Sequence, residues 1–357
     1  MDNSYFVYAE PENKILIERL HICTWEFKDE TSLIEFGFEI DFSSIEDKKN
    51  ILLNIFIPWL NNDCIVEDFY LKLSTSNNSR FIFNDSITHT VSLDGGRNLK
   101  GVIHEFKSRN QLCIHPIEIE VNSILKKINV GLDLSRYLDQ IKKLVAKDEN
   151  VKKPNLYFRF AVKPRNPVIA TIRNGITKST ILYDIKVNER RNIPEELIDE
   201  IEKNELCVVN TCFCFNIVPN SYDLVFFDNS SLQSVRTLEY EAFKSYLNDS
   251  RIKKDELLVV FNKRSKGKPF SFFNIYAKER IGAGQFALAT LVSFVSGIFL
   301  FIPAYRKSFK PELTLYDVWT NLPSEIYIGF GIILLTLILF LRYYLLTILK
   351  SWYQSLM

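Results

Sequence analysis

A short acidic and basic pair in the middle of the chain is the first group of side chains that could do chemistry. Asp184 and Lys186 flank Ile185 in a run with strand character, so both side chains point to one face of a sheet. In metal-dependent nucleases, carboxylates hold Mg²⁺ and a lysine can assist the attack of water. The pair lacks a further acidic partner, and polar residues on the outer face of a strand are common. A metal-dependent hydrolase or nuclease that uses Asp184 and Lys186 is therefore one functional hypothesis.

Three closely spaced cysteines raise the question of a metal site. Cys207, Cys212 and Cys214 are spaced C-x4-C-x-C, which differs from the C-x2-C spacing of zinc sites. On a strand Cys212 and Cys214 share one face, so packing in a core explains them better. The histidines are scattered and none pairs with another ligand at helical spacing: His21, His89, His104 and His115. We expect neither a metal nor a cofactor.

The elements that must position these residues are mostly strands. The chain of 357 residues has 28 Phe and 16 Tyr but only 12 Gly and 2 Met, a composition that suits pleated sheets. In LIEFGFEIDF, residues 33–42, Phe36 and Phe38 alternate with Glu35 and Glu39, which predicts a half-buried strand. Similar short runs follow, residues 80–83 among them, separated by turn clusters. The formal net charge of +1 gives no global field that would attract nucleic acid, so we expect no such partner.

The expected fold class is α+β, with a β-rich cytosolic part made of two sandwich or barrel-like modules. A helix that begins near Asp133 closes the first module, residues 1–148. A polar, charged stretch separates it from a second α+β module, residues 155–262, which has a short helix after Pro194. A basic juxtamembrane linker, residues 263–280, follows the second module.

Two apolar runs near the C-terminus predict a transmembrane hairpin. Residues 281–302 carry no charge and are long enough to cross a hydrocarbon core of about 30 Å. Residues 326–349 form the second span, in which Arg342 lies off centre and can snorkel toward the headgroups. Residues 303–325 are the expected external loop. The lipid bilayer is then a partner of the chain.

The basic residues before the first span predict the orientation of the hairpin. They outnumber the bases of the external loop, and the positive-inside rule then places both termini in the cytoplasm of a multi-pass inner-membrane protein. The N-terminus lacks the features of a secretory signal, which agrees with this localisation. Four of these bases can also bind anionic lipid headgroups: Lys263, Arg264, Lys266 and Lys268.

One face of the first predicted span carries small residues. Ala289, Ser293 and Gly297 recur every four residues, so a second helix can approach this stripe closely. Packing against the second span of the same chain and self-association between chains explain the stripe equally well. The second alternative predicts a homo-oligomer.

The predicted layout, a β-rich module followed by a terminal hairpin, resembles bacterial membrane effectors that sense a ligand or partner and then perturb the inner membrane. This resemblance implies a non-enzymatic sensor whose cytosolic part binds a protein or a small molecule and drives association of the transmembrane helices. Membrane permeabilisation in bacterial defence would follow. The alternatives are a membrane-tethered hydrolase or nuclease and a membrane scaffold for a cytosolic partner.

Overall fold

The structure of the chain is a computed structural model that describes most of the residues before 280 and few after it. The described residues are 3–28, 31–93, 99–147, 152–175, 178–266, 270–279 and 289–297, with Thr314, Tyr316, Tyr327, Gly331 and Leu334. The chain divides into two compact units, Met1–Ile172 with Thr180–Ala277 and Arg173–Ser179 with Lys278–Met357. The sheets and the cleft described below lie in the first unit, apart from one hairpin tip and the last two residues of β19 in the first sheet.

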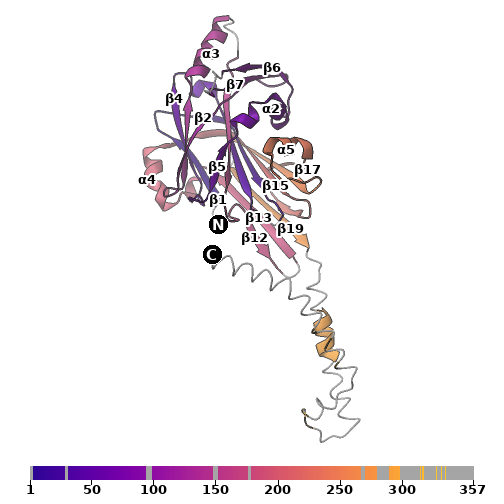
Figure 1. Cartoon of the computed structure of the whole chain (residues 1–357). Helices are drawn as coiled ribbons and strands as arrows, with labels where there is room; N and C mark the ends of the chain where they lie inside the picture. The colour runs from indigo at the N-terminus through magenta and orange to yellow at the C-terminus, as the bar shows by residue number, and fades with distance from the viewer. Residues whose placement is uncertain are drawn as a thin grey trace. The chain divides into compact units, whose positions relative to one another are not determined.

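Nine strands form the first of two large mixed sheets (Figure 1): β1 (Asn3–Ala9), β4 (Asn50–Phe56), β9 (Glu118–Asn122), β10 (Lys127–Asp133), β12 (Thr171–Asn174), β13 (Lys178–Val187), β14 (Glu205–Leu206), β16 (Asp223–Phe227) and β19 (Phe270–Glu279). Their order is β16-β19-β13-β1-β4-β10-β9, with β12 beside β13 and β14 beside β1. Strands β1 and β13 are parallel, whereas β1 and β4 are antiparallel.

Ten strands form the second sheet: β2 (Leu16–Trp25), β3 (Leu33–Ile40), β5 (Ile65–Asp68), β6 (Ile87–Ser92), β7 (Val102–Phe106), β8 (Leu112–Ile114), β11 (Asn155–Lys163), β15 (Val208–Pro219), β17 (Leu232–Thr237) and β18 (Leu257–Ser265). Their order is β17-β18-β15-β2-β3-β11-β8-β7-β6, with β5 beside β11. The β-rich character predicted from the composition is confirmed, because these two sheets make up most of the described structure.

The main core contains alternate residues from strands of both sheets. Phe36 and Phe38 of β3 point into it, and Phe38 stacks on Phe158 of β11 with ring centroids 4.9 Å apart. Each buried phenylalanine contributes about 1.5–3 kcal/mol through the removal of apolar area from water. Helix α3 (Ser135–Lys147) contributes Tyr137 and Ile141 to the same core. The predicted helix after Asp133 is confirmed, and the Asp133 carboxylate accepts the backbone N–H of Ser135 at 3.1 Å.

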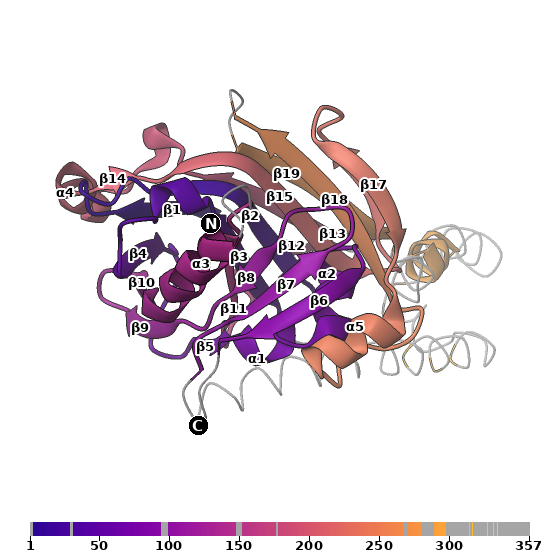
Figure 2. The ribbon, with the colours of Figure 1, turned by 90° about the horizontal axis from the view of Figure 1, so that it is seen from above.

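The outer face of the second sheet carries a helical cover, which places β3 inside the protein on both of its faces. The cover consists of α1 (Tyr70–Leu73), α2 (Ser76–Ile82) and α5 (Tyr240–Leu247), which lie together beside β6 and β7 (Figure 2). Every residue of β3 is buried, Glu35 and Glu39 included. The prediction of a half-buried strand is therefore wrong, because alternation identifies the polar face but not the elements that cover it.

The second helix predicted from the sequence is present and packs on the first sheet. The helix expected after Pro194 is α4 (Glu195–Lys203), whose Leu197 packs with Phe6 and Phe56 on the outer side of the first sheet. Residues 1–148 and 155–262 contribute strands to the same two sheets. Residues 263–280, expected as a linker, hold the end of β18 and the described strand β19. The described part of the chain also contains two short 3₁₀ helices, η1 (Phe42–Ser44) and η2 (Arg190–Asn192).

The predicted transmembrane hairpin needs correction. Within the described ranges, no helix combines the length and the hydrophobicity that a membrane crossing requires. Apart from 289–297, the residues of 281–302, and most of 303–325 and 326–349, lie outside the described residues. The hairpin, the external loop and the inner-membrane localisation are not retained.

Candidate binding cleft

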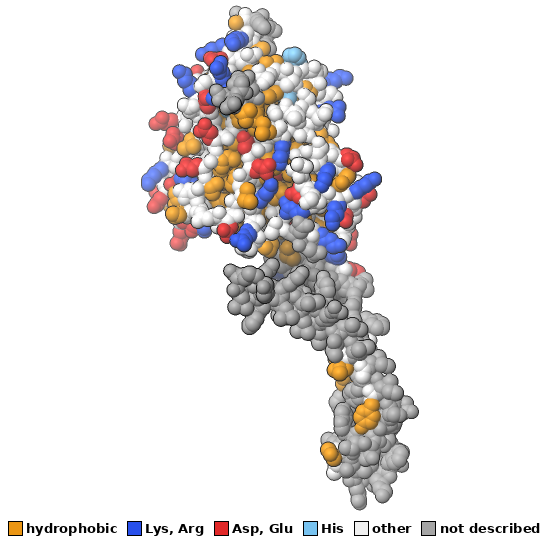
Figure 3. Space-filling view, viewed as in Figure 1, with side chains coloured by type: hydrophobic (Ala, Val, Ile, Leu, Met, Phe, Trp, Pro, Cys, Tyr) orange, Lys and Arg blue, Asp and Glu red, His pale blue; other side chains and the backbone are white. Residues whose placement is uncertain are grey.

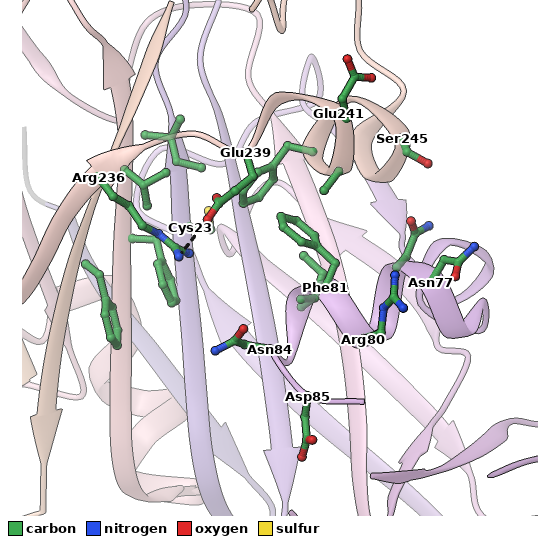
Figure 4. A pocket seen from close by; sticks show the side chains of 18 of the residues that line it. Cys23, Asn77, Arg80, Phe81, Asn84, Asp85, Arg236, Glu239, Glu241 and Ser245 are labelled. Atoms are coloured by element: carbon green, nitrogen blue, oxygen red, sulfur yellow. Dashed lines mark ion pairs between the residues drawn. The ribbon is translucent and has the colours of Figure 1, made fainter. Parts of the chain in front are cut away.

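A cleft of about 910 Å³ lies on the outer face of the second sheet, between the strands and helices α2 and α5 (Figure 4). Phe215 of β15 and Phe261 of β18 contribute to its floor, together with Cys23 of β2. Phe81 of α2 and Phe243 of α5 line it from the helical cover, with ring centroids 4.6 Å apart in an edge-to-face contact. The cleft therefore has an apolar interior built by segments far apart in the sequence.

The aromatic floor follows from strand alternation. In the run CFCF of β15, Cys212 and Cys214 point into the main core, so Phe213 and Phe215 point to the outer face. Phe215 lies directly opposite Phe261 in the antiparallel ladder with β18, and the two rings stack 4.6 Å apart at 7°. Both phenylalanines are half-buried, and they give the cleft a flat apolar surface on which a planar or aliphatic group can rest.

Charged groups of both signs surround this floor. Arg236 of β17 pairs with Glu239 at 2.9 Å, as the dashed line in Figure 4 marks. Arg80, Asp85 and Glu241 also line the cleft. The face of the molecule seen in Figure 3 likewise mixes acidic and basic side chains. The rim therefore does not select strongly for a ligand of either charge.

A buried ion pair lies at the other end of the cleft, under the helical cover. The guanidinium of Arg159 on β11 donates through Nη2 to the Glu35 carboxylate of β3 at 2.5 Å. The same carboxylate accepts Trp25 Nε1–H at 2.7 Å and the Tyr246 hydroxyl at 3.0 Å. Burial disfavours the charged guanidinium, but the charge of Glu35 outweighs this effect and holds the pKa of Arg159 above its usual range. Arg159 therefore presents a permanent cation to the cleft.

A tyrosine and a histidine extend this polar network along the sheet. The Tyr157 hydroxyl lies 3.0 Å from His21 Nδ1. Desolvation and the charges of Arg159 and Arg109 lower the pKa of His21 well below its usual value, so the imidazole is neutral at pH 7. Gly37 makes room for this arrangement, because a Cβ at that position would lie 2.2 Å from the Tyr157 hydroxyl oxygen.

The thiol in the floor is poorly suited to covalent chemistry. Cys23 is 3% exposed, and burial together with the nearby Glu35 charge raises its pKa well above the usual value. It therefore remains a thiol at neutral pH rather than a nucleophilic thiolate. All six cysteines are free and five of them are buried, and Cys207, Cys212 and Cys214 belong to the main core, as predicted. The arrangement of the cleft favours binding over catalysis.

The residues that the sequence suggested for catalysis lie on the other sheet. Asp184 and Lys186 are partly exposed on β13 and form an ion pair with each other at 2.9 Å. Throughout the described ranges, no group of three or more His, Cys, Asp and Glu side chains is placed to hold a metal ion. The prediction of a membrane-tethered hydrolase is corrected together with that of the membrane hairpin, because no described helix could serve as its membrane anchor.

The basic residues assigned to the membrane surface belong to a sheet. Lys263 lies 5.5 Å from the centre of the Phe213 ring, and Arg264 donates to the Asp228 carboxylate and to Ser230 Oγ. Lys266 is exposed just after β18, and Lys268 lies outside the described residues. The assignment of these four residues to anionic lipid headgroups stays a prediction.

The stripe of small residues also loses its predicted role. Ala289, Ser293 and Gly297 are exposed in the described helical residues 289–297, and no described atom lies within 4 Å of a Cβ built on Gly297. Within the described ranges, no helix is long and apolar enough to cross a membrane, and this finding corrects three further predictions. They are the homo-oligomer formed through transmembrane helices, the membrane sensor or effector, and the membrane scaffold.

Sequence reasoning missed Arg159 and the role of Glu35. A signal for both was present, because each is a charged residue in a strand made mostly of apolar residues, LYFRFAV and LIEFGFEI. A charge in such a strand is either exposed on an open face or paired beneath a cover. Opposite charges in two such strands would have suggested that the strands are neighbours with a covered face.

Comparisons with known proteins leave the family of this chain open. No protein-family model matches it, and no curated protein matches its sequence. Among solved structures, the Mu homology domain of Fcho1 from Danio rerio with bound Eps15 peptide matches at 7% identity and a TM-score of 0.16. That match covers 75% of this chain and 81% of the Fcho1 chain. A TM-score this low does not indicate a shared fold or function.

Proposed function

We propose that this chain is a binding module that holds a segment of another polypeptide in the cleft of the second sheet. The observation that carries the proposal is the cleft itself, with its stacked aromatic floor and a rim of both charges. Its volume of about 910 Å³ lies near the upper limit of the roughly 300–1,000 Å³ typical of small-molecule pockets. Aromatic and arginine side chains are also the residue types most enriched at protein interfaces.

The extent of the cleft across the sheet supports a chain segment as the occupant. Its lining reaches from Arg236 on β17 to Arg159 on β11, which are five neighbouring strand pairs apart. At about 4.8 Å for each pair, this distance is about 24 Å, the length of about seven residues of extended chain. A compact metabolite would leave much of this length unfilled, whereas an extended segment can follow it.

The edge of the sheet next to the cleft supports the same proposal. Strand β17 is the last strand in the order of the second sheet, and five of its six residues are exposed. Ser234 and Arg236 of this strand line the cleft. An extended partner that leaves the cleft on this side would meet backbone groups able to continue the sheet, a common mode of peptide recognition.

The test is selection of binding peptides with the full chain. The immobilised chain is screened against a phage-displayed library of random peptides about as long as the cleft, and selected peptides are synthesised for anisotropy titrations. We expect Phe261→Ala to weaken binding by about tenfold or more, because the ring supplies half of the aromatic floor. Phe226→Ala is the matched control, since this half-exposed phenylalanine lies on β16 of the other sheet.

Two outcomes would contradict the proposal. One is a library that yields no peptide with measurable affinity for the wild-type chain. The other is a set of peptides that lose as much affinity with Phe226→Ala as with Phe261→Ala, which would place their binding outside the cleft. Thermal unfolding of both variants confirms that each remains folded during the titrations.

A further inference from the structure

We propose that a basic site beside the aromatic floor selects polypeptide segments in which an acidic residue adjoins an apolar one, an inference that rests on the proposed function. The site consists of Lys263 of β18 and Arg19 of β2. Both bases lie outside the lining of the cleft. They therefore add a charge preference that the mixed rim of the cleft does not have.

The aromatic floor continues past the lining of the cleft, which stops at Phe215 and Phe261 along β15 and β18. The next pair on the same face, two residues further along each strand, is Phe213 and Lys263. The Phe213 ring stacks on that of Phe261 with centroids 5.7 Å apart, and Lys263 Nζ lies 5.5 Å from the centre of the Phe213 ring. Because the two pairs are only about 7 Å apart along a strand, one side chain of the occupant can rest on Phe261 while its neighbour reaches Lys263.

The ammonium of Lys263 is exposed and has no carboxylate partner among the described residues. The next residue of β18, Arg264, points to the other face and is already paired with Asp228. A carboxylate brought to Lys263 would lie beside the apolar Phe213 ring, where water screens an ion pair less than in open solvent. Lys263 is therefore a cation that is available to a partner.

Arg19 is the second base on this face of the sheet. Strands β2 and β15 are parallel neighbours, and Arg19 lies opposite Thr211, two residues before Phe213. Phe213 lies opposite Lys263 of β18, on the other side of β15. The Cα atoms of the two bases are then about 12 Å apart. A carboxylate above Phe213 would thus lie between two positive charges.

The charge of Arg19 is only partly balanced. Its Nε lies 3.7 Å from Glu39 Oε2, and 39% of its side chain is exposed. The same carboxylate oxygen already accepts Arg109 Nη2 at 2.9 Å, so one negative charge faces two guanidinium groups. The adjacent Glu18 carboxylate binds Asn210 Nδ2 at 2.7 Å. The site therefore keeps an excess of positive charge that an acidic residue can balance.

The two bases favour a carboxylate over a phosphate. Phosphate groups are commonly recognised by arginine side chains that bind two oxygens at once. Here Arg19 is engaged with Glu39, and Lys263 offers a single ammonium. Because the proposed occupant is a segment of a longer chain, the carboxylate belongs to an Asp or Glu side chain, and the residue that rests on Phe261 is apolar or aromatic.

Capped dipeptides test this charge preference without the natural partner. N-acetyl-Phe-Glu-amide, N-acetyl-Phe-Gln-amide and N-acetyl-Phe-Lys-amide share a phenyl ring for the floor and differ in the charge beside it, whereas N-acetylphenylalanine carries a terminal carboxylate. The ¹⁵N-labelled full chain is titrated with each probe, and the backbone amide signals of Phe261 and Lys263 are followed. We expect the Glu probe to bind about threefold to fivefold more tightly than the Gln probe at low salt, and about equally in 0.5 M NaCl.

A variant without the free cation tests the same contact. Lys263→Gln removes the charge but keeps a polar side chain, so the Glu and Gln probes should bind this variant equally. Lys142→Gln is the matched control, because Lys142 is exposed on α3, outside the lining of the cleft. It should keep the full preference for the Glu probe. Thermal unfolding of both variants checks that each remains folded.

Three outcomes would overturn the acidic site. One is equal binding of the Glu and Gln probes to the wild-type chain at low salt. Another is tighter binding of N-acetylphenylalanine, which would assign the bases to the end of a chain. The third is an absence of preference among the dipeptides while Lys263→Gln weakens binding to phosphatidylglycerol vesicles, which would assign Lys263 to a lipid surface.

The peptide selection separates this inference from the proposed function. Selected peptides without an acidic residue next to an apolar one would overturn the charge preference while the polypeptide-binding function stands. A preference for the Glu probe that disappears in Lys263→Gln, in a chain that selects no peptide, would support the acidic site and remove the polypeptide.

Discussion

The replacement of Gly37 by alanine is expected to destabilise the chain by a purely steric route. Gly37 lies in β3, and its backbone is outside the positive-φ region that favours glycine. A Cβ at this position would lie 2.2 Å from the hydroxyl oxygen and 3.0 Å from Cζ of Tyr157. Because non-bonded atoms normally stay more than about 3.4 Å apart, the hydroxyl would have to move by roughly 1 Å.

The expected loss follows from the two effects of this displacement. Insertion of a methyl group into a packed region costs about 1–3 kcal/mol. Movement of Tyr157 also breaks its hydrogen bond with His21, which contributes about 1 kcal/mol. Gly37→Ala should therefore lower the free energy of unfolding by about 2–4 kcal/mol, measured by urea denaturation at pH 7.

Two further variants make this reasoning refutable. In the Tyr157→Phe background the hydroxyl is absent, so the cost of Gly37→Ala should fall to about 1 kcal/mol. Gly131→Ala on β10 is the matched control, because its Cβ would meet only ordinary contacts of 3.5 Å or more, and we expect a change below about 1 kcal/mol. An equal cost of Gly37→Ala in both backgrounds, or a cost no larger than that of Gly131→Ala, would refute the steric account.

Two other predictions concern buried carboxylates. Glu35→Gln leaves the Arg159 cation without its counter-charge and should lower the free energy of unfolding, measured in urea, by about 3–5 kcal/mol. The control is Glu67→Gln, which removes one charge of a partly exposed pair with Lys72 and should lower the same free energy by less than about 1 kcal/mol. Burial raises the pKa of Glu26 from 4.5 to about 7, so its contribution to stability is complete below pH 4.5 and is lost as the pH rises through 7. At about 1.4 kcal/mol per pH unit, this loss is about 3 kcal/mol. The free energy of unfolding, measured from pH 4.5 to 8, should therefore depend less on pH in Glu26→Gln than in the wild-type chain. An equal pH dependence of the two chains would contradict the raised pKa of Glu26.

Local periodicity predicted the parts of the fold that depend on one element at a time. The alternation in β3 correctly placed Phe36 and Phe38 in a core, and helical spacing correctly predicted α3. The run around residue 80 was expected as a strand but forms α2, because serine and asparagine at its start suit both turns and helix starts. The sequence could not decide between these two roles without the tertiary context.

The candidate site depends on pairings between distant segments, which a single sequence does not record. Arg159 and Glu35 are more than a hundred residues apart, and their contact exists because β3 and β11 are adjacent and antiparallel. Asp184 and Lys186, by contrast, are close in sequence and form a local ion pair on the first sheet. Reasoning from local spacing therefore favoured the local pair and missed the distant one.

The polar face of β3 shows why strand alternation alone did not predict the residues of the candidate site. Alternation groups Glu35, Gly37 and Glu39 on one face, and that face normally points to water. Here helices cover it, so each glutamate must meet a cation from a neighbouring segment, Arg159 or Arg109. Such pairs fix the positions of their members more tightly than solvent-exposed charges, since breaking one leaves a buried charge unpaired. A strand that is polar on one face and buried on both thus depends on charged partners from distant segments, and one of these partners, Arg159, lines the cleft.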